Sequence, residues 1–219
     1  MGEPGHVSQV NLRLIGAGKR FERGWIFRNL NFCGQEGERW AITGPNGSGK
    51  STLLLSLGGY LELTEGGLSL THANRTRPDG QVSRFTALAA PYLDLPPALT
   101  VAELLQFHRQ LKGIRSGWEE PKQLDLSGLK GHFHKKTAQL SSGLRQRLRL
   151  YLAFGCAAPL LLLDEPGSHL DSHGFEWYLS LLAQPFLAEL LLVVASNDPA
   201  EYAGMSVLSD LAVIEPENG

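Results

Sequence analysis

The sequence predicts an α/β fold that contains a parallel sheet. Three observations lead to this prediction. A glycine-rich loop at residues 44–52 lies between a short apolar strand and the start of a helix. Four consecutive leucines at residues 160–163 are typical of a strand that is buried on both faces, as in a parallel sheet. Residues 190–195 form another buried apolar strand. With 219 residues, the chain is one ample domain, or a core with a subdomain.

Strands dominate the expected structure up to residue 90. Val10, Leu12 and Leu14 alternate with polar residues, which predicts a half-buried strand over residues 7–15. Together with the strand-like residues 25–32, it forms an antiparallel β layer that leads into the glycine-rich loop. The further elements expected here are a buried strand at residues 40–43, a helix from residue 52, turns at 58–59 and 64–67, a strand at 68–71, a turn at 78–80 and a strand at 85–90.

Helices and apolar strands share the rest of the chain. Thr100 and Glu103 fit a capping box and predict a helix over residues 100–112. Ser141 or Ser142 is the natural cap of a later helix, which contains apolar residues at helical spacing. The remaining segments are a polar, irregular stretch at residues 116–136, the buried strand at 160–163, a tight loop at 167–171, a helix at 175–182, the strand at 190–195 and a closing strand at 206–214.

Composition and charge exclude some classes of function. The net charge of −2 gives no basic field that would attract nucleic acid. Arg145, Arg147 and Arg149 are therefore predicted to form a solvated helix face rather than a nucleic-acid-binding stripe. The two cysteines, Cys33 and Cys156, favour a reducing compartment and are interpreted as small buried apolar residues.

The sequence contains no segment that predicts insertion into a membrane. Residues 1–9 are polar and lack the apolar region of a secretory signal. The most apolar stretch, residues 179–195, is interrupted by Gln184, Pro185 and Glu189, which argues against a spanning helix. We therefore expect a protein that is soluble by itself and reaches a membrane only through a partner.

A phosphate-binding pattern, G-x-x-x-x-G-K-[ST], is central to the predicted function. It consists of Gly44, Pro45, Asn46, Gly47, Ser48, Gly49, Lys50, Ser51 and Thr52. Its glycines allow positive φ, so that successive N–H groups and the helix N-terminus surround an anion. Lys50 is expected to reach the β- and γ-phosphates, and Ser51 to offer its hydroxyl to Mg²⁺. The chain is therefore expected to bind a nucleoside triphosphate.

Two acids follow the leucine run, at the end of the strand where open α/β sheets place ligands. Asp164 is placed to hold Mg²⁺, directly or through water, and Glu165 to polarise the attacking water. An aromatic residue of the preceding β layer is expected to stack on an adenine ring. Phe21 and Trp25 are the candidates, and Phe21 is preferred.

Three motifs, in this order, resemble those of the ATP-binding subunits of ATP-binding cassette (ABC) transporters. They are the phosphate loop, the signature-like Leu140-Ser141-Ser142-Gly143-Leu144, and the acid pair followed by Pro166 and a turn at residues 168–171. The resemblance covers nearly the whole chain. It implies a P-loop NTPase core with an antiparallel β subdomain and an inserted α-helical subdomain at roughly residues 91–157, all within one ATP-binding domain at residues 1–219.

The resemblance also implies ligands and partners. In that family ATP, with Mg²⁺, lies between the phosphate loop of one subunit and the signature of the other, here Ser141, Ser142 and Gly143. The start of the signature helix offers N–H groups and a hydroxyl to the γ-phosphate. A head-to-tail homodimer, or a pair with another ATP-binding subunit, is therefore expected. A separate transmembrane permease would dock in the cleft between the core and helical lobes. The subunit would be cytoplasmic and peripheral on the inner face of the membrane, and no nucleic acid is expected as a partner.

The chain departs from the family pattern in three places. Ser142 stands where the signature normally has a second glycine, and Leu144 where it has a glutamine. The junction before the helical insert normally contains a glutamine, whereas here it contains Tyr92, which can supply a hydroxyl. Asn197 matches the position of the family's switch histidine. Asparagine can hydrogen-bond the γ-phosphate but carries no proton or charge near neutral pH.

Two functions remain open after these departures. The first is an ATPase that drives a membrane partner, with Glu165 as general base or water-orienting residue, Lys50 as charge stabiliser and Asn197 as a weaker γ-phosphate sensor. The second is a nucleotide-binding switch that closes on ATP and hydrolyses little or none of it. The intact acid pair favours the ATPase. His169 and His173 do not match the switch position and are interpreted as loop residues. A soluble ABC ATPase acting on DNA or ribosomes is disfavoured by the single cassette without sustained heptads.

Overall fold

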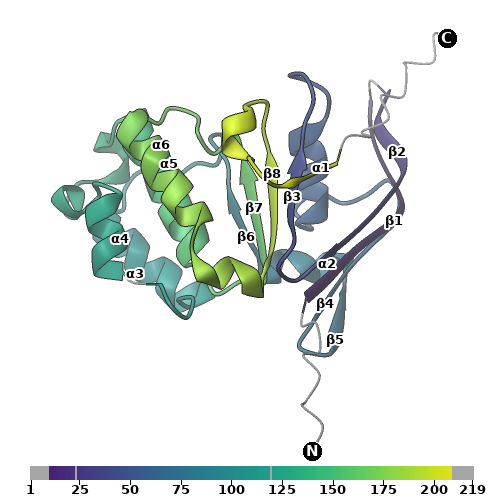
Figure 1. Cartoon of the computed structure of the whole chain (residues 1–219), viewed down its shortest axis with the longest axis horizontal. Helices are drawn as coiled ribbons and strands as arrows, with labels where there is room; N and C mark the ends of the chain where they lie inside the picture. The colour runs from purple at the N-terminus through teal and green to yellow at the C-terminus, as the bar shows by residue number, and fades with distance from the viewer. Residues whose placement is uncertain (1–9, 23, 119, 209–219) are drawn as a thin grey trace, which may run out of the picture.

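Two sheets and a group of helices make up the protein. The computed structural model describes residues 10–22, 24–118 and 120–208. An antiparallel sheet forms one end of the molecule, a parallel sheet lies in the middle, and most of the helices lie at the other end (Figure 1). The predicted α/β class with an antiparallel β subdomain is confirmed.

The antiparallel sheet has the strand order β2-β1-β4-β5. Its strands are β1 (Val10–Phe21), β2 (Gly24–Gln35), β4 (Glu65–His72) and β5 (Arg75–Pro78). The predicted turn at residues 64–67 is wrong, because Glu65 and Gly67 pair with β1. The glycines there instead mark an irregularity in the pairing of β1 with β4, where Gly66 has a φ of 82°. The predicted turn at residues 78–80 is also wrong, because β5 runs directly into the short helix α2 (Asp79–Val82).

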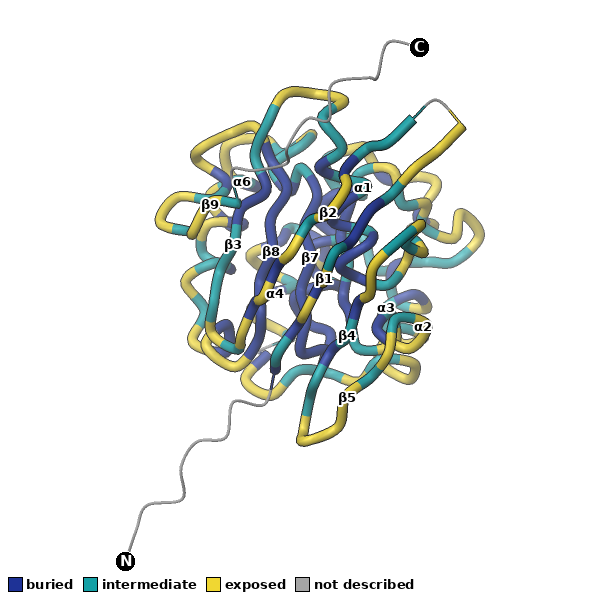
Figure 2. The backbone as a smooth tube through the Cα atoms, turned by 90° about the vertical axis from the view of Figure 1, so that its right-hand side faces the viewer, coloured by how far each residue is buried: buried dark blue, intermediate teal, exposed yellow. Residues whose placement is uncertain are grey.

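The parallel sheet has the strand order β6-β7-β8-β3-β9. Its strands are β3 (Arg39–Ile42), β6 (Thr86–Ala89), β7 (Leu160–Asp164), β8 (Leu191–Ala195) and β9 (Ser206–Leu208). Every residue of β7 and β8 is buried, which confirms the interpretation of the two apolar runs. These strands form the dark blue centre of the molecule in Figure 2. Residues 209–214 of the predicted closing strand lie outside the described residues.

Side-chain caps begin both helices for which the sequence predicts one. Thr100 Oγ1 accepts a hydrogen bond from Glu103 N at 3.2 Å, and Glu103 Oε2 accepts one from Thr100 N at 2.8 Å, so the predicted capping box of α3 (Val101–Lys112) is confirmed. Ser141 Oγ accepts from Leu144 N at 3.2 Å and thereby caps α5 (Ser142–Gly155). Ser141, rather than Ser142, is therefore the cap. The other long helices are α1 (Lys50–Leu57) and α6 (Ser172–Leu182).

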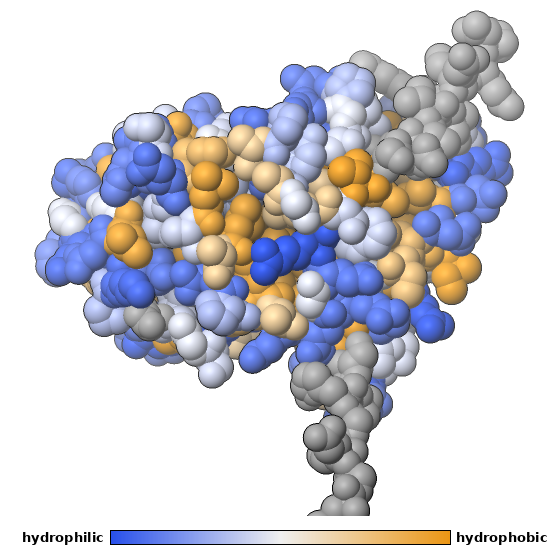
Figure 3. Space-filling view, in the orientation of Figure 1, coloured by the Kyte–Doolittle hydropathy of each residue, from blue (hydrophilic) through white to orange (hydrophobic). Residues whose placement is uncertain are grey.

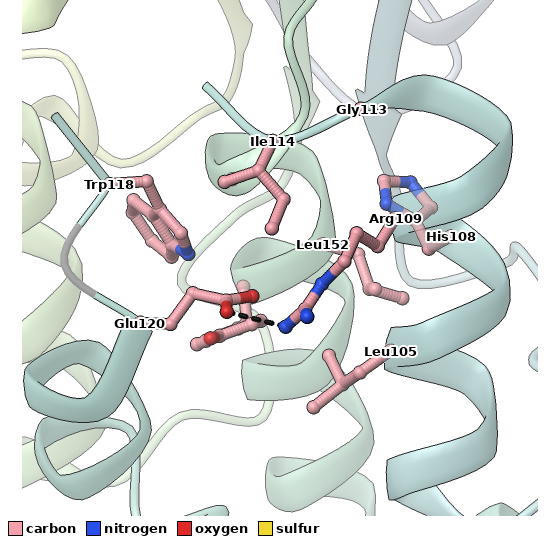
Figure 4. A pocket seen from close by; sticks show the side chains of 10 residues that line it. Leu105, His108, Arg109, Gly113, Ile114, Trp118, Glu120 and Leu152 are labelled. Carbon is pink, nitrogen blue, oxygen red and sulfur yellow. Dashed lines mark hydrogen bonds and ion pairs between the residues drawn. The ribbon is translucent and has the colours of Figure 1, made fainter. Parts of the chain in front are cut away.

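The stretch at residues 116–136 is less irregular than predicted, because it contains α4 (Glu120–Leu126). This short helix is held by tertiary contacts that its own sequence pattern does not reveal. Arg109 of α3 forms an ion pair with Glu120, with 2.5 Å between Nη2 and Oε2 (Figure 4). The buried Gln123 accepts a hydrogen bond from the indole N–H of Trp177 at 3.2 Å. Segment 91–157 thus contains α3, α4 and α5.

The arginines of α5 do not form the solvated face that was predicted. Arg147 is 7% exposed and donates to Ser127 O at 3.0 Å and to the carboxylate of Asp171. Arg149 Nε donates to Leu93 O at 2.8 Å. The guanidinium groups of these two residues satisfy carbonyl and carboxylate oxygens of neighbouring loops, which a reading of charge alone does not anticipate.

The cysteine prediction is confirmed for one residue and wrong for the other. Cys156 is buried, whereas Cys33 is exposed. Cys33 lies in β2, whose alternate residues face solvent because the strand belongs to a sheet that is covered on one side. Neither cysteine is in a disulfide bond.

Hydrophobic residues gather over the middle of one face. In the view of Figure 3 they form a band between the helical end of the molecule and the antiparallel sheet. Within residues 10–22, 24–118 and 120–208, no helix combines the length and hydropathy that crossing a bilayer requires.

Candidate functional site

The phosphate loop has the backbone conformation that its glycines were predicted to allow. Gly44, Gly47 and Gly49 have φ values of 138°, 82° and 94°. Gly49 is the N-cap of α1 and makes no side-chain capping bond, so the first N–H groups of the helix point towards the loop. A Cβ atom at Gly49 would lie 2.3 Å from Cγ2 of Ile26 in β2. Residue 49 must therefore be glycine, both for its φ and because the antiparallel sheet packs against the loop.

Lys50 places a positive charge inside this loop. The whole residue is only 6% exposed. The Nζ atom donates to Gly44 O at 2.9 Å and to Pro45 O at 3.1 Å. These bonds direct the ammonium group across the loop, so the cation is oriented before any anion arrives.

Asp164 combines a satisfied and an unsatisfied carboxylate oxygen. The residue ends β7 and is 1% exposed. Its Oδ2 atom accepts a hydrogen bond from the Tyr92 hydroxyl at 2.9 Å. Its Oδ1 atom is buried and, within the part of the chain that the structure describes, has no hydrogen-bond partner. A buried carboxylate oxygen without a partner is costly, and oxygen is the ligand that Mg²⁺ prefers. The residue therefore fits a metal ligand.

Glu165 follows in a conformation that is unusual for a residue with a side chain. Its φ is 44°, in the left-handed region, and its N–H donates to Ala195 O at 2.8 Å. Burial raises the pKa of its carboxyl group, the charges of Asp164 and Asp198 act in the same direction, and the charge of Lys50 opposes them. A raised pKa brings this carboxylate closer to the proton affinity that suits a general base near neutral pH.

Asn197 lies directly beside the phosphate loop. Its Nδ2 atom donates to Oδ1 of Asn46 at 2.5 Å. The parallel pairing of β3 with β8, in which Ile42 is opposite Ala195, brings the loops after both strands to the same edge of the sheet. The structure thus brings the switch position, the phosphate loop and the acid pair together.

The signature residues form a separate surface. Ser141, Ser142 and Gly143 line a cavity of about 510 Å³ together with His169, Asp171 and His173. Among the described residues that line it, none belongs to residues 44–52. The structure therefore does not bring the predicted signature ligands to the phosphate loop of their own chain.

The two histidines beside the signature differ in their settings. His169 lies in a turn with a φ of 63°, as the loop interpretation expects. A Cβ atom at Gly143 would lie 2.8 Å from His169 O, which shows how closely this turn packs on the signature. His173 is in the first turn of α6, so the loop interpretation is wrong for it.

The aromatic candidates for adenine stacking lie at the end of the antiparallel sheet nearest the phosphate loop. Phe21 is 46% exposed, and Lys19 Nζ is 5.1 Å from its ring centroid. Trp25 has two guanidinium groups over its ring, those of Arg28 at 4.4 Å and Arg20 at 5.9 Å. Two cations therefore lie over Trp25 and one over Phe21. Stacking of adenine on Phe21 stays a prediction.

Two buried polar residues next to the site were missed by the sequence reasoning. Gln146 of α5 is 0% exposed and donates to Pro166 O at 3.0 Å, which joins the signature helix to the turn after the acid pair. Glu201 is 4% exposed and accepts a hydrogen bond from Gly167 N in the same turn. Their polar character gave no signal, because a glutamine on a helix and a glutamate after a loop are usually solvated.

Comparison with known families agrees with the three motifs. Residues 27–168 match the family model described as "ABC transporter". The chain belongs to the ABC transporter family. Within it, this protein is a nucleotide-binding subunit. The matched segment includes the phosphate loop, the signature and the acid pair of this ABC subunit.

Individual relatives are similar over most of the ABC subunit. The cytochrome c biogenesis ATP-binding export protein CcmA of Nitrobacter winogradskyi is 36% identical over 195 residues, which cover 86% of this chain and 93% of the relative. The spermidine/putrescine import ATP-binding protein PotA of Fusobacterium nucleatum is 32% identical over 190 residues, which cover 85% of this chain and 48% of the relative.

Solved structures are similar as well. The dimeric structure of MJ0796, a bacterial ABC transporter cassette, has a TM-score of 0.71 at 28% identity and covers 87% of this chain and 90% of its own. A putative ABC transporter ATP-binding protein from Pyrococcus furiosus has a TM-score of 0.72 at 20% identity. The match covers 90% of this chain and 95% of the other, and it supports the fold alone.

The bond between Tyr92 and Asp164 can be tested by removing one hydroxyl. Tyr92→Phe is expected to lower the free energy of unfolding by about 1–3 kcal/mol, because it leaves a buried carboxylate with one hydrogen bond fewer. Urea unfolding without nucleotide or metal measures this. Tyr60→Phe is the matched control, since Tyr60 is 45% exposed, Tyr92 is 49% exposed, and the Tyr60 hydroxyl donates to the neutral Thr86 O at 3.1 Å. A loss no larger than that of the control would contradict a special role of the charged acceptor.

Proposed function

We propose that this ABC subunit hydrolyses ATP and thereby drives a membrane permease to which it is bound on the cytoplasmic face. The observation that carries the proposal is the pairing of two features at one edge of the parallel sheet. One is the phosphate loop with the inward-directed Lys50. The other is the acid pair, in which Asp164 is buried with an unpartnered oxygen and Glu165 follows with a raised pKa.

The residues of this site fit ATP with Mg²⁺. The N–H groups of the phosphate loop and Lys50 would hold the β- and γ-phosphates. Oδ1 of Asp164 and the hydroxyl of Ser51 are oxygen ligands suited to Mg²⁺, which is usually bound through one or two protein oxygens together with phosphates. The bound ion would neutralise negative charge on the phosphates. Phe21 would stack on the adenine.

Hydrolysis would depend mainly on positioning and charge. Glu165 orients the attacking water and accepts its proton, and its left-handed backbone fixes the direction of the side chain. Lys50 stabilises charge on the oxygens of the transferred phosphoryl group. Asn197, already bonded to Asn46 of the phosphate loop, donates a hydrogen bond to the γ-phosphate without exchanging a proton.

The site is proposed to be completed by a second copy or a paired subunit. Ser141, Ser142 and Gly143 lie on a surface separate from their own phosphate loop, and the related cassette MJ0796 forms dimers. The permease partner is proposed from the names of the relatives, which include export and import proteins. The higher identity to the export protein CcmA and the fuller coverage of both chains favour export as the direction of transport.

A second candidate function is a nucleotide-gated switch with little or no hydrolysis. The presence of Asn197 at the switch position favours it, because an amide whose Nδ2 already bonds Asn46 supplies no titratable proton. In this case ATP would close the dimer, and release of ATP rather than its cleavage would open it.

Release of phosphate from ATP tests the proposal. Purified protein is incubated with ATP and Mg²⁺, with and without a chelator, and with and without vesicles that contain the co-expressed permease. We expect turnover that the chelator abolishes. Binding of ATP without release of phosphate, even in the presence of the permease, would overturn the proposal and support the switch.

A further inference from the structure

Glu201 is a buried acid that none of the motifs explains. It ends the short 3₁₀ turn Pro199–Glu201, which follows the loop that carries Asn197. The residue is 4% exposed, and its Oε2 atom is buried without a hydrogen-bond partner among the described residues. Burying a carboxyl oxygen without a hydrogen-bond partner is costly, which points to a structural or chemical role for this group.

One end of Glu201 contacts the turn after the acid pair. Its Oε1 atom accepts a hydrogen bond from Gly167 N at 2.9 Å. A Cβ atom at Gly167 would lie 2.2 Å from this oxygen, so only glycine allows the carboxylate to approach. The turn itself begins at Glu165, whose carbonyl accepts from Ser168 N at 3.0 Å. Displacing Gly167 would therefore move the backbone that directs Glu165.

The other end of Glu201 belongs to the loop of the switch position. Glu201 N donates to Asp198 O at 3.0 Å, and Asp198 N donates to Ser196 Oγ at 2.9 Å. The buried hydroxyl of Tyr178 in α6 donates to Glu201 O at 2.7 Å and fixes the backbone from the opposite side. Asn197 lies between Ser196 and Asp198 and contacts the phosphate loop.

We propose that Glu201 is a positioning residue, whose carboxylate joins the turn that directs Glu165 to the loop that carries Asn197. Glu165 and Asn197, the two side chains proposed to face the γ-phosphate, then keep a fixed separation. This inference rests on the proposed hydrolysis for its effect on turnover, but not for the contact itself. The carbonyl of Pro166 in the same turn accepts from Gln146 of the signature helix, so the joined unit reaches the surface where a second copy would bind.

The hydrogen bond between Glu201 and Gly167 is expected to respond to pH. Burial raises the pKa of Glu201 to about 7, the charges of Glu165 and Asp198 act in the same direction, and the neighbouring Ser196 hydroxyl and the hydrogen bond from Gly167 oppose them. The phenol of Tyr178 is the titratable group that faces it from α6. An ionised carboxylate accepts a stronger hydrogen bond than a neutral carboxyl. The contact with Gly167 therefore tightens as the pH rises through about 7.

Amide hydrogen exchange tests the contact without reference to catalysis. Glu201→Ala is expected to speed exchange at Gly167 about tenfold or more, because the amide loses its acceptor. Gly167→Ala is a second variant that removes the contact from the other side, read at residues 196–201. Glu201→Gln keeps an acceptor oxygen and should restore protection. Glu176→Gln, an exposed site on α6, is the matched control. Unchanged exchange in both alanine variants would overturn the proposal.

ATP turnover then tests the consequence for the reaction. We expect Glu201→Ala to lower kcat about tenfold with nucleotide affinity unchanged within twofold, and Glu201→Gln to recover most of kcat. The wild-type kcat should contain an ionisation near pH 7 that Glu201→Gln lacks. If kcat depends on pH in the same way in the wild type and in Glu201→Gln, the proposed pH response is wrong. A wild-type protein that shows no turnover even in the presence of the permease would overturn the proposed function, while the exchange experiment would still decide the contact.

Discussion

Replacing Glu165 by glutamine is expected to lower ATP turnover by about 10²–10⁴-fold, because the amide has the same size but cannot accept a proton from water. Binding of ATP should be retained, since the phosphate loop and Lys50 are untouched. Phosphate release at saturating ATP and Mg²⁺ measures turnover. Titration with a fluorescent ATP analogue measures binding.

The matched control for this variant is Glu176→Gln, which removes a charge from an exposed position on α6. Thermal unfolding separates catalysis from misfolding. The pKa of Glu165 is raised in the folded protein, so its charge opposes folding, and stability is lost as the pH rises through that pKa. At pH 8 the glutamine variant should therefore unfold at the same temperature as the wild type or higher. Turnover within twofold of the wild type would show that Glu165 is not the base.

The second large effect is expected for Lys50→Met. This variant keeps an unbranched apolar side chain but removes the ammonium group that bonds Gly44 O and Pro45 O. Removing one partner of a buried, hydrogen-bonded charge pair costs about 2 kcal/mol or more. We therefore expect affinity for ATP to fall at least about 30-fold, since about 1.4 kcal/mol corresponds to a factor of ten.

Equilibrium titration with a fluorescent ATP analogue checks this prediction. Lys135→Met is the control, because Lys135 is exposed and lies outside the phosphate loop and the acid pair. If both variants bind ATP equally well, Lys50 does not contribute its charge to the nucleotide, and the assignment of residues 44–52 as the phosphate site is wrong.

The sequence predicts the elements whose signals are local. The capping box of Thr100 and Glu103, the glycine conformations at residues 44–49 and the buried strand at residues 160–163 each depend on neighbours in the chain. These features include the main catalytic candidates, because phosphate loops and acid pairs are placed by a strand and the turn that follows it.

The features that were missed depend on contacts between distant segments. Arg147 looks solvated from its helix and is instead buried against Ser127 and Asp171. Helix α4 is held by Arg109 and Trp177 rather than by its own pattern. Glu201 is placed by its contact with Gly167, and in the sequence this contact is marked only by the glycine itself. Tertiary contacts override local preference in each case.

The contact between Gly49 and Ile26 has a consequence for nucleotide binding. Ile26 belongs to the antiparallel sheet, whereas the loop that it touches leads out of the parallel sheet. The phosphate loop is thus wedged between the two sheets, and a change in how the sheets dock against each other would be felt at the loop. We therefore expect substitutions that enlarge the side chain at Ile26, outside the nucleotide motifs, to weaken ATP binding.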